Sequence, residues 1–88
     1  MKELELGTIV ITPGIEALKM PLGFMQETLK AHKNGNWGFA DEIDKALNER
    51  AVKYGERVLS VWYYNNTKYW IMTQGDRDFT RILLPEEY

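Results

Sequence analysis

The chain contains no cysteine and a single histidine, His32. The absence of cysteine excludes disulfide bonds, thiolate zinc sites and cysteine nucleophiles, and it fits a reducing compartment such as the cytoplasm. A histidine metal site or a Ser-His-Asp relay would have to be built around His32 alone. His32 comes late in an expected helix beside Lys30 and Lys33, where a role at the helix end is the more ordinary interpretation.

Long apolar runs and an excess of one charge are also missing. No segment approaches the roughly 20 apolar residues of a membrane-spanning helix, and Glu3 and Glu5 stand where a secretory signal would need an apolar stretch. We therefore expect a soluble cytoplasmic protein that does not bind membranes. The 11 basic and 13 acidic residues give a formal net charge of −2, which provides no overall positive field to attract nucleic acid.

Known cofactor motifs are absent as well. The glycines form neither Gly-x-x-x-x-Gly-Lys-Ser/Thr nor Gly-x-Gly-x-x-Gly, so the sequence does not indicate a phosphate-binding loop. Because no catalytic motif is visible either, we expect a non-catalytic protein that needs no cofactor or metal.

Aromatic residues are what the sequence has in quantity, with three Trp, five Tyr and three Phe among 88 residues. A chain of this length buries only about 60–65% of its unfolded surface, so it needs large side chains to stabilise one core. No Pro/Gly/Ser-rich stretch interrupts it, which predicts a single domain over residues 1–88.

The first half of the chain predicts a short strand and three helical segments. β-Branched residues favour a strand over residues 7–11, and Thr12-Pro13-Gly14 then supplies the start of a helix near residues 13–19. A second helix begins at Pro21 and stops at Asn34-Gly35-Asn36. A third begins after Asp41 and ends at Gly55, and we expect its apolar stripe to face the core: Ile43, Ala46, Leu47, Ala51 and Tyr54.

The second half changes to the two-residue period of strands. We expect strands over residues 58–64, 68–74 and 79–84, joined by a turn at Asn65-Asn66 and a loop at residues 75–78. The predicted fold class is therefore α+β in two layers, with a short N-terminal strand, three helical segments and a three-stranded antiparallel meander.

The length of the first hairpin loop decides which residues share a sheet face. A loop of two or four residues pairs Tyr63 with Lys68 and places Leu59, Val61, Trp70 and Met72 on one apolar face, which we expect to lie against the helices. A loop of three residues would exchange the faces. The opposite face then mixes aromatic and hydroxyl side chains: Ser60, Trp62, Tyr64, Thr67, Tyr69, Ile71 and Thr73.

An uncovered sheet face of this composition is typical of a contact surface. We expect Trp62, Tyr64 and Tyr69 to bind a partner protein or a second copy of the chain, with Trp37 as a further anchor in its loop. In the alternative interpretation the first strand or a chain terminus covers this face, Trp37 folds back, and these aromatics belong to the core. The residues alone leave both open.

Charged residues in the second half suggest two other hypotheses. Asp76, Arg77 and Asp78 form a candidate loop site. A small enzyme would combine the two aspartates with His32. Aspartates in turns, however, usually accept hydrogen bonds from their own backbone. An accessory nucleic-acid-binding protein would instead neutralise phosphates and stack bases on aromatic rings. Its basic residues would be Arg57, Lys68, Arg77 and Arg81.

A set of residues spread along the chain carries a resemblance: Thr12-Pro13-Gly14, Trp37-Gly38, Asn48, Ala51, Gly55, Arg57, Leu59-Ser60, Trp70, Asp76-Arg77, Thr80 and Leu83-Leu84-Pro85-Glu86-Glu87-Tyr88. Together they resemble a family of small bacterial proteins of no established activity, labelled plasmid-related or type I restriction modification subunits. The resemblance implies kinship without a mechanism. This chain departs from the family at Met20 and Asn65-Asn66, where the family has Ser and Asp-Gly. A methyltransferase activity is excluded, since it needs a large α/β domain with a Gly-rich turn.

Overall fold

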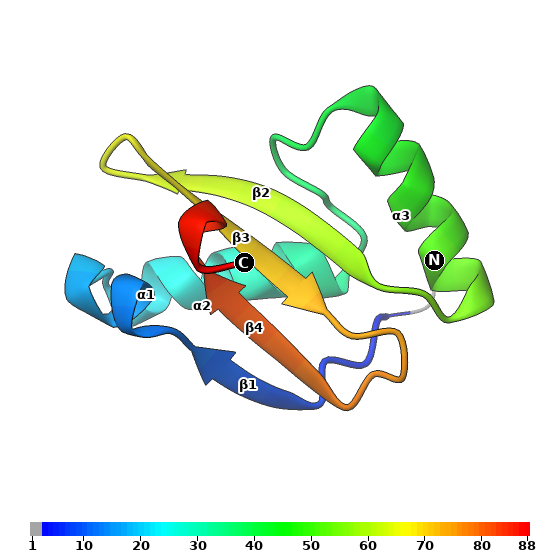
Figure 1. The fold of residues 1–88 in the computed structure, drawn as a ribbon, viewed down its shortest axis with the longest axis horizontal. Helices are drawn as coiled ribbons and strands as arrows, with labels where there is room; N and C mark the ends of the chain where they lie inside the picture. Colours follow the sequence, from blue (N-terminus) through cyan, green and yellow to red (C-terminus); the bar gives the residue numbers. More distant parts are fainter. Residues whose placement is uncertain (1–2) are drawn as a thin grey trace.

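The protein is described over residues 3–88 by a computed structural model (Figure 1). Its elements are β1 (Thr8–Ile11), α1 (Pro13–Leu18), α2 (Leu22–Lys33), α3 (Glu42–Tyr54), β2 (Val58–Tyr64), β3 (Thr67–Thr73), β4 (Phe79–Leu83) and the short 3-10 helix η1 (Pro85–Glu87). The predicted α+β class and the three helices are confirmed. None of the helices in this part of the chain has the length and apolar character needed to span a membrane.

All four strands belong to one mixed sheet, in the order β1-β4-β3-β2. β2, β3 and β4 pair antiparallel in sequence order. β1 adds a fourth strand, parallel to β4, with Thr8 opposite Phe79 and Ile11 opposite Ile82. The predicted antiparallel meander of three strands is present, but the prediction did not place the first strand in the same sheet, because a parallel partner far along the chain leaves no local turn signal.

The hairpin between β2 and β3 has the predicted two-residue turn. Asn65 and Asn66 have φ angles of +48° and +62°, which is the backbone conformation of a type I′ turn. Tyr63 consequently pairs with Lys68, and the ladder continues toward Leu59 opposite Met72. The predicted register is confirmed.

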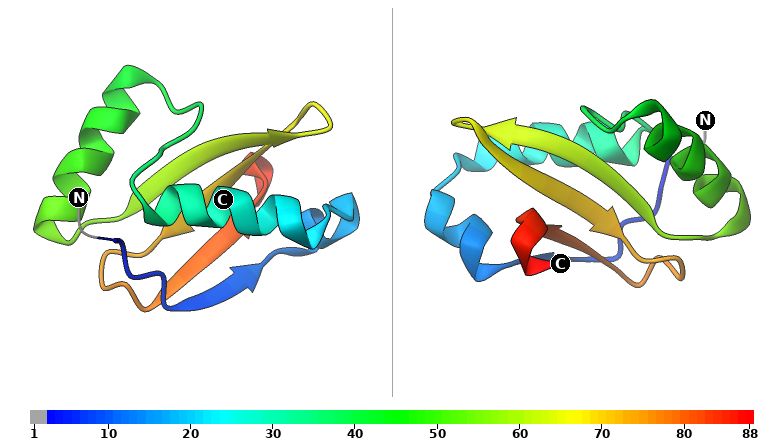
Figure 2. Two further views of the ribbon diagram at one scale, coloured as in Figure 1. Left: turned by 180° about the vertical axis from the view of Figure 1, so that it is seen from behind. Right: turned by 45° about the horizontal axis from the view of Figure 1, so that its top comes forward.

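The helices, however, cover the opposite face of the sheet to the one predicted. α2 runs across the back of the sheet (Figure 2, left). There Tyr69 is fully buried, and its hydroxyl lies 2.8 Å from that of Thr28 on α2. Trp62 and Tyr64 pack half-buried against the same cluster. The predicted contact surface of Trp62, Tyr64 and Tyr69 is therefore part of the core.

The physical reason lies in the polar residues that α2 buries. Thr28 and His32 are both buried, and a buried polar group costs free energy unless it finds a hydrogen-bond partner. The face with Tyr69, Ser60 and Thr73 offers hydroxyl groups for this purpose, whereas Leu59, Val61, Trp70 and Met72 on the other face offer no hydroxyl group. Hydrophobicity alone favours the other face, which is why the predicted position of the helices is wrong.

α3 also packs differently from the prediction. Most of its apolar stripe is exposed: Ile43, Ala46, Leu47 and Tyr54. The helix instead turns Asn48 and Ala51 inward, and Asn48 bonds the free edge of β2. Its Nδ2 donates to the carbonyl of Leu59 (2.7 Å), and its Oδ1 accepts from the Leu59 N–H (3.1 Å). One amide side chain thus replaces a neighbouring strand and leaves the apolar stripe free.

The next outward-facing residue of that edge, Val61, is bonded by the segment between α2 and α3. Val61 donates its N–H to the Trp37 carbonyl (3.2 Å) and accepts from the Phe39 N–H (2.8 Å). Gly38 between them has φ +64°, and a Cβ there would lie 2.3 Å from the Val61 carbonyl oxygen. Trp37 itself is buried and donates Nε1–H to Glu49 (2.6 Å). The prediction of Trp37 as an exposed anchor is wrong, because its ring folds back onto the core.

Glu87 ties the C-terminal segment to the start of α1. Its carboxylate accepts hydrogen bonds from the Thr12 hydroxyl, from the Leu84 N–H (2.8 Å) and from the Gly14 N–H (2.9 Å). These bonds, the one from Thr12 first, hold the pKa of the Glu87 carboxyl below its usual value. They also place η1 and Tyr88 in front of the sheet (Figure 1).

Replacing Asn48 with alanine is expected to lower the free energy of unfolding by about 2 kcal/mol, because Leu59 loses both partners of its backbone groups. Urea unfolding followed by tryptophan fluorescence measures the change. Asn34→Ala is the matched control, since that side chain makes one exposed hydrogen bond, to the Lys30 carbonyl. Equal losses in the two variants would contradict the role of Asn48.

Candidate functional site

The single histidine belongs to a chain of buried hydrogen bonds. His32 and Ser60 each have a solvent-exposed fraction of 0%. The Nδ1 atom of His32 lies 2.7 Å from Ser60 Oγ, and its Nε2 atom lies 2.9 Å from Thr73 Oγ1. Both ring nitrogens are therefore occupied, and this Ser-His pair is closed to any substrate.

The two end groups of this hydrogen-bond chain determine which group donates at each step. This chain of hydrogen bonds runs through six groups: Trp62, Ser60, His32, Thr73, Thr80 and the carbonyl of Leu6. The Trp62 indole can only donate, and the Leu6 carbonyl can only accept. Each hydroxyl must therefore accept from the Trp62 side and donate toward Leu6, which places the single proton of neutral His32 on Nε2.

The same arrangement disfavours a charged imidazole. A second proton on Nδ1 would have to donate to Ser60 Oγ, and the Ser60 hydroxyl hydrogen would then lose Nδ1 as its acceptor. Burial, followed by the positive charge of Arg77, lowers the pKa of His32 to about 4. The helix-end role expected for His32 is wrong, because the side chain turns into the core.

The candidate loop site is also tied to the backbone. Asp76 accepts a hydrogen bond from the Asp78 N–H (2.9 Å). The Arg77 guanidinium donates to the carbonyls of Ala51 (3.0 Å) and Glu56 (2.6 Å), where α3 ends. The loop therefore holds α3 in place, and it does not share a pocket with His32. Within residues 3–88, no three His, Asp or Glu side chains gather in an arrangement that could hold a metal ion.

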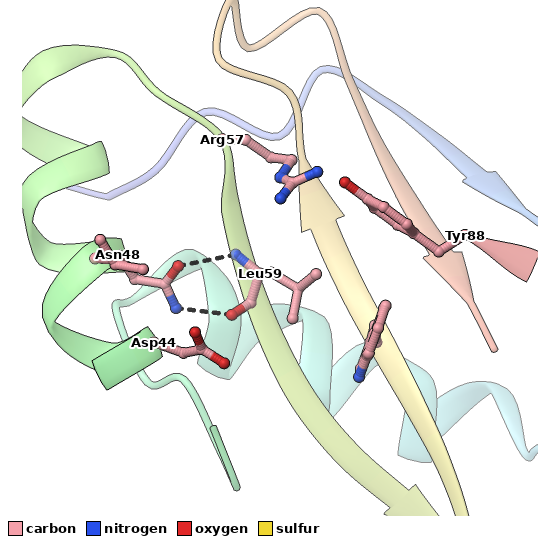
Figure 3. Close-up of a pocket in the computed structure, with 7 residues that line it drawn as sticks. Asp44, Asn48, Arg57, Leu59 and Tyr88 are labelled. Atoms are coloured by element: carbon pink, nitrogen blue, oxygen red, sulfur yellow. Dashed lines mark hydrogen bonds between the residues drawn. The ribbon is translucent and has the colours of Figure 1, made fainter. Parts of the chain in front are cut away.

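The front of the sheet, which is the face opposite α2, carries a groove of about 280 Å³. α3 forms one wall, β2 and β3 form the floor, and the C-terminal residue forms the other wall (Figure 3). We call it the front groove, and it is lined by Asp44, Leu47, Asn48, Arg57, Leu59, Trp70 and Tyr88. Leu59 and Trp70, which the sequence placed under the helices, are its half-buried floor.

Aromatic and charged groups face each other across this groove. The Tyr88 ring meets Trp70 edge-on at 5.8 Å between centroids, and the Arg57 guanidinium lies 5.0 Å from the Tyr88 ring centre. Asp44 stands on the opposite wall (Figure 3). In the described part of the chain the salt bridges are Lys45–Glu42 and Arg50–Glu56. Neither Asp44 nor Arg57 therefore has a salt-bridge partner among residues 3–88.

Apolar and basic side chains extend the same face beyond the groove. Phe39 is 68% exposed, and its ring packs edge-on against Tyr63 at 5.2 Å. Lys68, the cross-strand neighbour of Tyr63, places its ammonium group 5.9 Å from the centre of the Tyr63 ring. Arg81 shares this face because it pairs with Met72. None of the front-facing residues of β2, β3 and β4 is acidic.

No protein-family model, curated protein or solved structure matches this chain. The resemblance to plasmid-related bacterial proteins stays a prediction from the residues that carry it. The function must therefore be argued from the geometry of the front groove.

One signal in the sequence pointed toward this groove. Apolar residues occur on both faces of β2 and β3 and on a full stripe of α3, which is more than one small core can bury. The sequence did not show which of these faces stays open, since that depends on where α2 packs.

The depressed pKa of His32 predicts that acid destabilises the fold. In the unfolded chain the His32 imidazole has its ordinary pKa of 6.5, whereas in the folded chain it becomes protonated only near pH 4. The free energy of unfolding should therefore be highest above pH 6.5 and fall by about 1.4 kcal/mol per pH unit between these values.

Urea unfolding at several pH values from 7.5 to 4.5 tests this, with His32→Gln as the control that has no imidazole to titrate. The slope of unfolding free energy against pH should be smaller in the variant, even if the variant is less stable throughout. Identical slopes would show that His32 does not cause the pH dependence.

Proposed function

We propose that this protein is a non-catalytic interaction module that binds a segment of a partner protein in the front groove. The observation that supports it most is the exposed apolar stripe of α3 beside an aromatic floor. Ile43 is 74% exposed and Leu47 56%, and Leu47 lines the groove directly. Large exposed apolar side chains around a groove favour a contact site over a solvated surface.

The apolar part of the groove is suited to one anchoring side chain. Leu47, Leu59 and Trp70 surround its lower part, and an aliphatic or aromatic residue of a partner would bury its surface there. The exposed Phe39 and Tyr63 continue this surface along the sheet. A partner segment lying across the groove would cover them as well.

The charges favour an acidic partner segment. Arg57, Lys68 and Arg81 lie on the front face, where the strands contribute no carboxylate, and they outnumber Asp44, the acidic residue that lines the groove. Charge complementarity across an interface selects partners and speeds their association. We therefore expect a partner segment with a large apolar residue and neighbouring Asp or Glu residues.

Selection from a displayed library of random peptides tests this proposal. Enriched peptides should carry an apolar anchor next to acidic residues, and Leu47→Asp should weaken their binding at least about tenfold, because it places a carboxylate at the groove. Leu22→Asp is the matched control, since Leu22 on α2 is 67% exposed and away from the groove. Peptides that bind both variants equally, or no enrichment at all, would contradict the proposal.

A second candidate, single-stranded nucleic acid, is supported by the same face. Arg57 lies over the Tyr88 ring and Lys68 over the Tyr63 ring, and such a combination of basic and aromatic side chains suits phosphate and base contacts.

Fluorescence anisotropy with a short oligothymidylate distinguishes this candidate. Binding through three phosphates should weaken about tenfold or more between about 50 and 200 mM salt, and Lys68→Gln should reduce both affinity and salt dependence. An absence of binding at low salt would eliminate nucleic acid and leave the peptide hypothesis standing.

A further inference from the structure

The two edge strands of the sheet differ in whether other segments bond their outward backbone groups. At the β2 edge, Asn48 and residues 37–39 bond the outward backbone groups of Leu59 and Val61. The β1 edge carries no such cover: β1 is the last strand of the sheet, and both figures show no element of residues 3–88 beyond it (Figures 1 and 2).

β1 also lacks most of the features that protect exposed edges. Its residues Ile9, Val10 and Ile11 are each 42% exposed, and the strand contains no charged residue and no proline. Natural proteins usually protect an edge strand with lysine, proline, a bulge or a covering segment. Of the usual devices β1 has only its shortness, so it is available for pairing with another strand.

The ladder to β4 determines which backbone groups of β1 are free. The N–H of Thr8 bonds the Asp78 carbonyl (3.1 Å), and that of Thr12 bonds the Ile82 carbonyl (3.2 Å). Successive residues of a strand point their backbone groups in alternate directions. The groups of Ile9 and Ile11 therefore point outward, away from the sheet.

We propose that β1 pairs antiparallel with β1 of a second copy of this chain, about a twofold axis at Val10. Residues 8–12 read Thr-Ile-Val-Ile-Thr, which is the same in both directions. Antiparallel pairing about Val10 therefore places Thr8 opposite Thr12, Ile9 opposite Ile11 and Val10 opposite itself, and like β-branched pairs of this kind stabilise a ladder. This self-complementarity is the reason to choose a second copy over a foreign strand.

The neighbouring residues exclude the other registers. Centring the pair on Ile9 would bring Gly7 into the ladder, but Gly7 has φ +64° and lies against the Asp78 carbonyl. Centring it on Ile11 would place Pro13 opposite Ile9, and proline has no N–H to donate. Only the axis at Val10 keeps four intermolecular hydrogen bonds within the extended residues.

The proposed contact between the two β1 strands is small, so we expect the dimer to have a low affinity. Strand pairing over five residues buries much less than the roughly 1,600 Å² of a standard interface. The dimer should therefore be weak, with a dissociation constant on the order of 100 µM. It uses a surface separate from the front groove, so it neither requires nor blocks the proposed function.

Disulfide trapping tests the register directly, because the chain has no cysteine of its own. In Val10→Cys the two thiols would occupy a non-hydrogen-bonded pair with Cα atoms about 4.5 Å apart, which a disulfide can span. In the matched control Thr8→Cys, the two thiols would be offset by four residues, or about 13 Å along the strands. Under mild oxidation at equal concentration, Val10→Cys should form covalent dimers at least about tenfold faster.

Sedimentation across a concentration series supplies a second measurement on the unmodified chain. Wild type should show a mass that rises with concentration, and Ile9→Lys should remain monomeric with an unchanged circular dichroism spectrum, since Ile9 is exposed. Leu47→Asp in the groove should dimerise like wild type. Any one of three outcomes would overturn the proposal. The two cysteine variants could be trapped equally fast, wild type could remain monomeric at every concentration, or Leu47→Asp alone could lose the dimer.

Discussion

The buried imidazole of His32 constrains how the two layers of this protein stack. Its two nitrogens need partners that α2 itself does not supply, and only the hydroxyl-bearing face of the sheet provides them, through Ser60 and Thr73. The cost of an unsatisfied buried polar group exceeds the small difference in hydrophobicity between the two faces. α2 therefore packs on the face that carries the hydroxyl groups. The opposite face is covered only in part, with Met72 buried and Leu59 and Trp70 half-buried.

Two further attachments shape the face of the sheet opposite α2. α3 does not lie flat on it but attaches to the edge of β2 through Asn48, so its apolar stripe stays exposed. Glu87 holds the C-terminal segment against the start of α1 and brings Tyr88 over Trp70. The front groove results from these two attachments. It combines an apolar floor with the basic side chains of Arg57, Lys68 and Arg81 on the same face, which is the basis for proposing an acidic partner segment.

Local signals were sufficient for the elements and for the hairpin. Thr12 and Asp41 cap α1 and α3, and Gly55 ends α3 in a left-handed conformation. Two consecutive asparagines form the tight turn that sets the register of β2 and β3. These signals act between residues close in the chain, so they can be recognised without knowledge of the tertiary structure. The candidate site was less predictable: the Trp62, Tyr64, Tyr69 and Trp37 side chains are core or half-buried, whereas Arg57 and Trp70 line the groove.

The sequence by itself thus determined the class of the fold, the helix ends, the hairpin and the alternation of side chains along each strand. Only the tertiary structure decided which face α2 covers, that β1 lies parallel to β4, and that Asn48 closes one edge while the other stays bare. The reason is physical: capping and turn formation depend on neighbouring residues. The choice of face depends on whether His32 and Thr28 find hydrogen-bond partners from strands about 30 to 40 residues away, and no local pattern encodes that match.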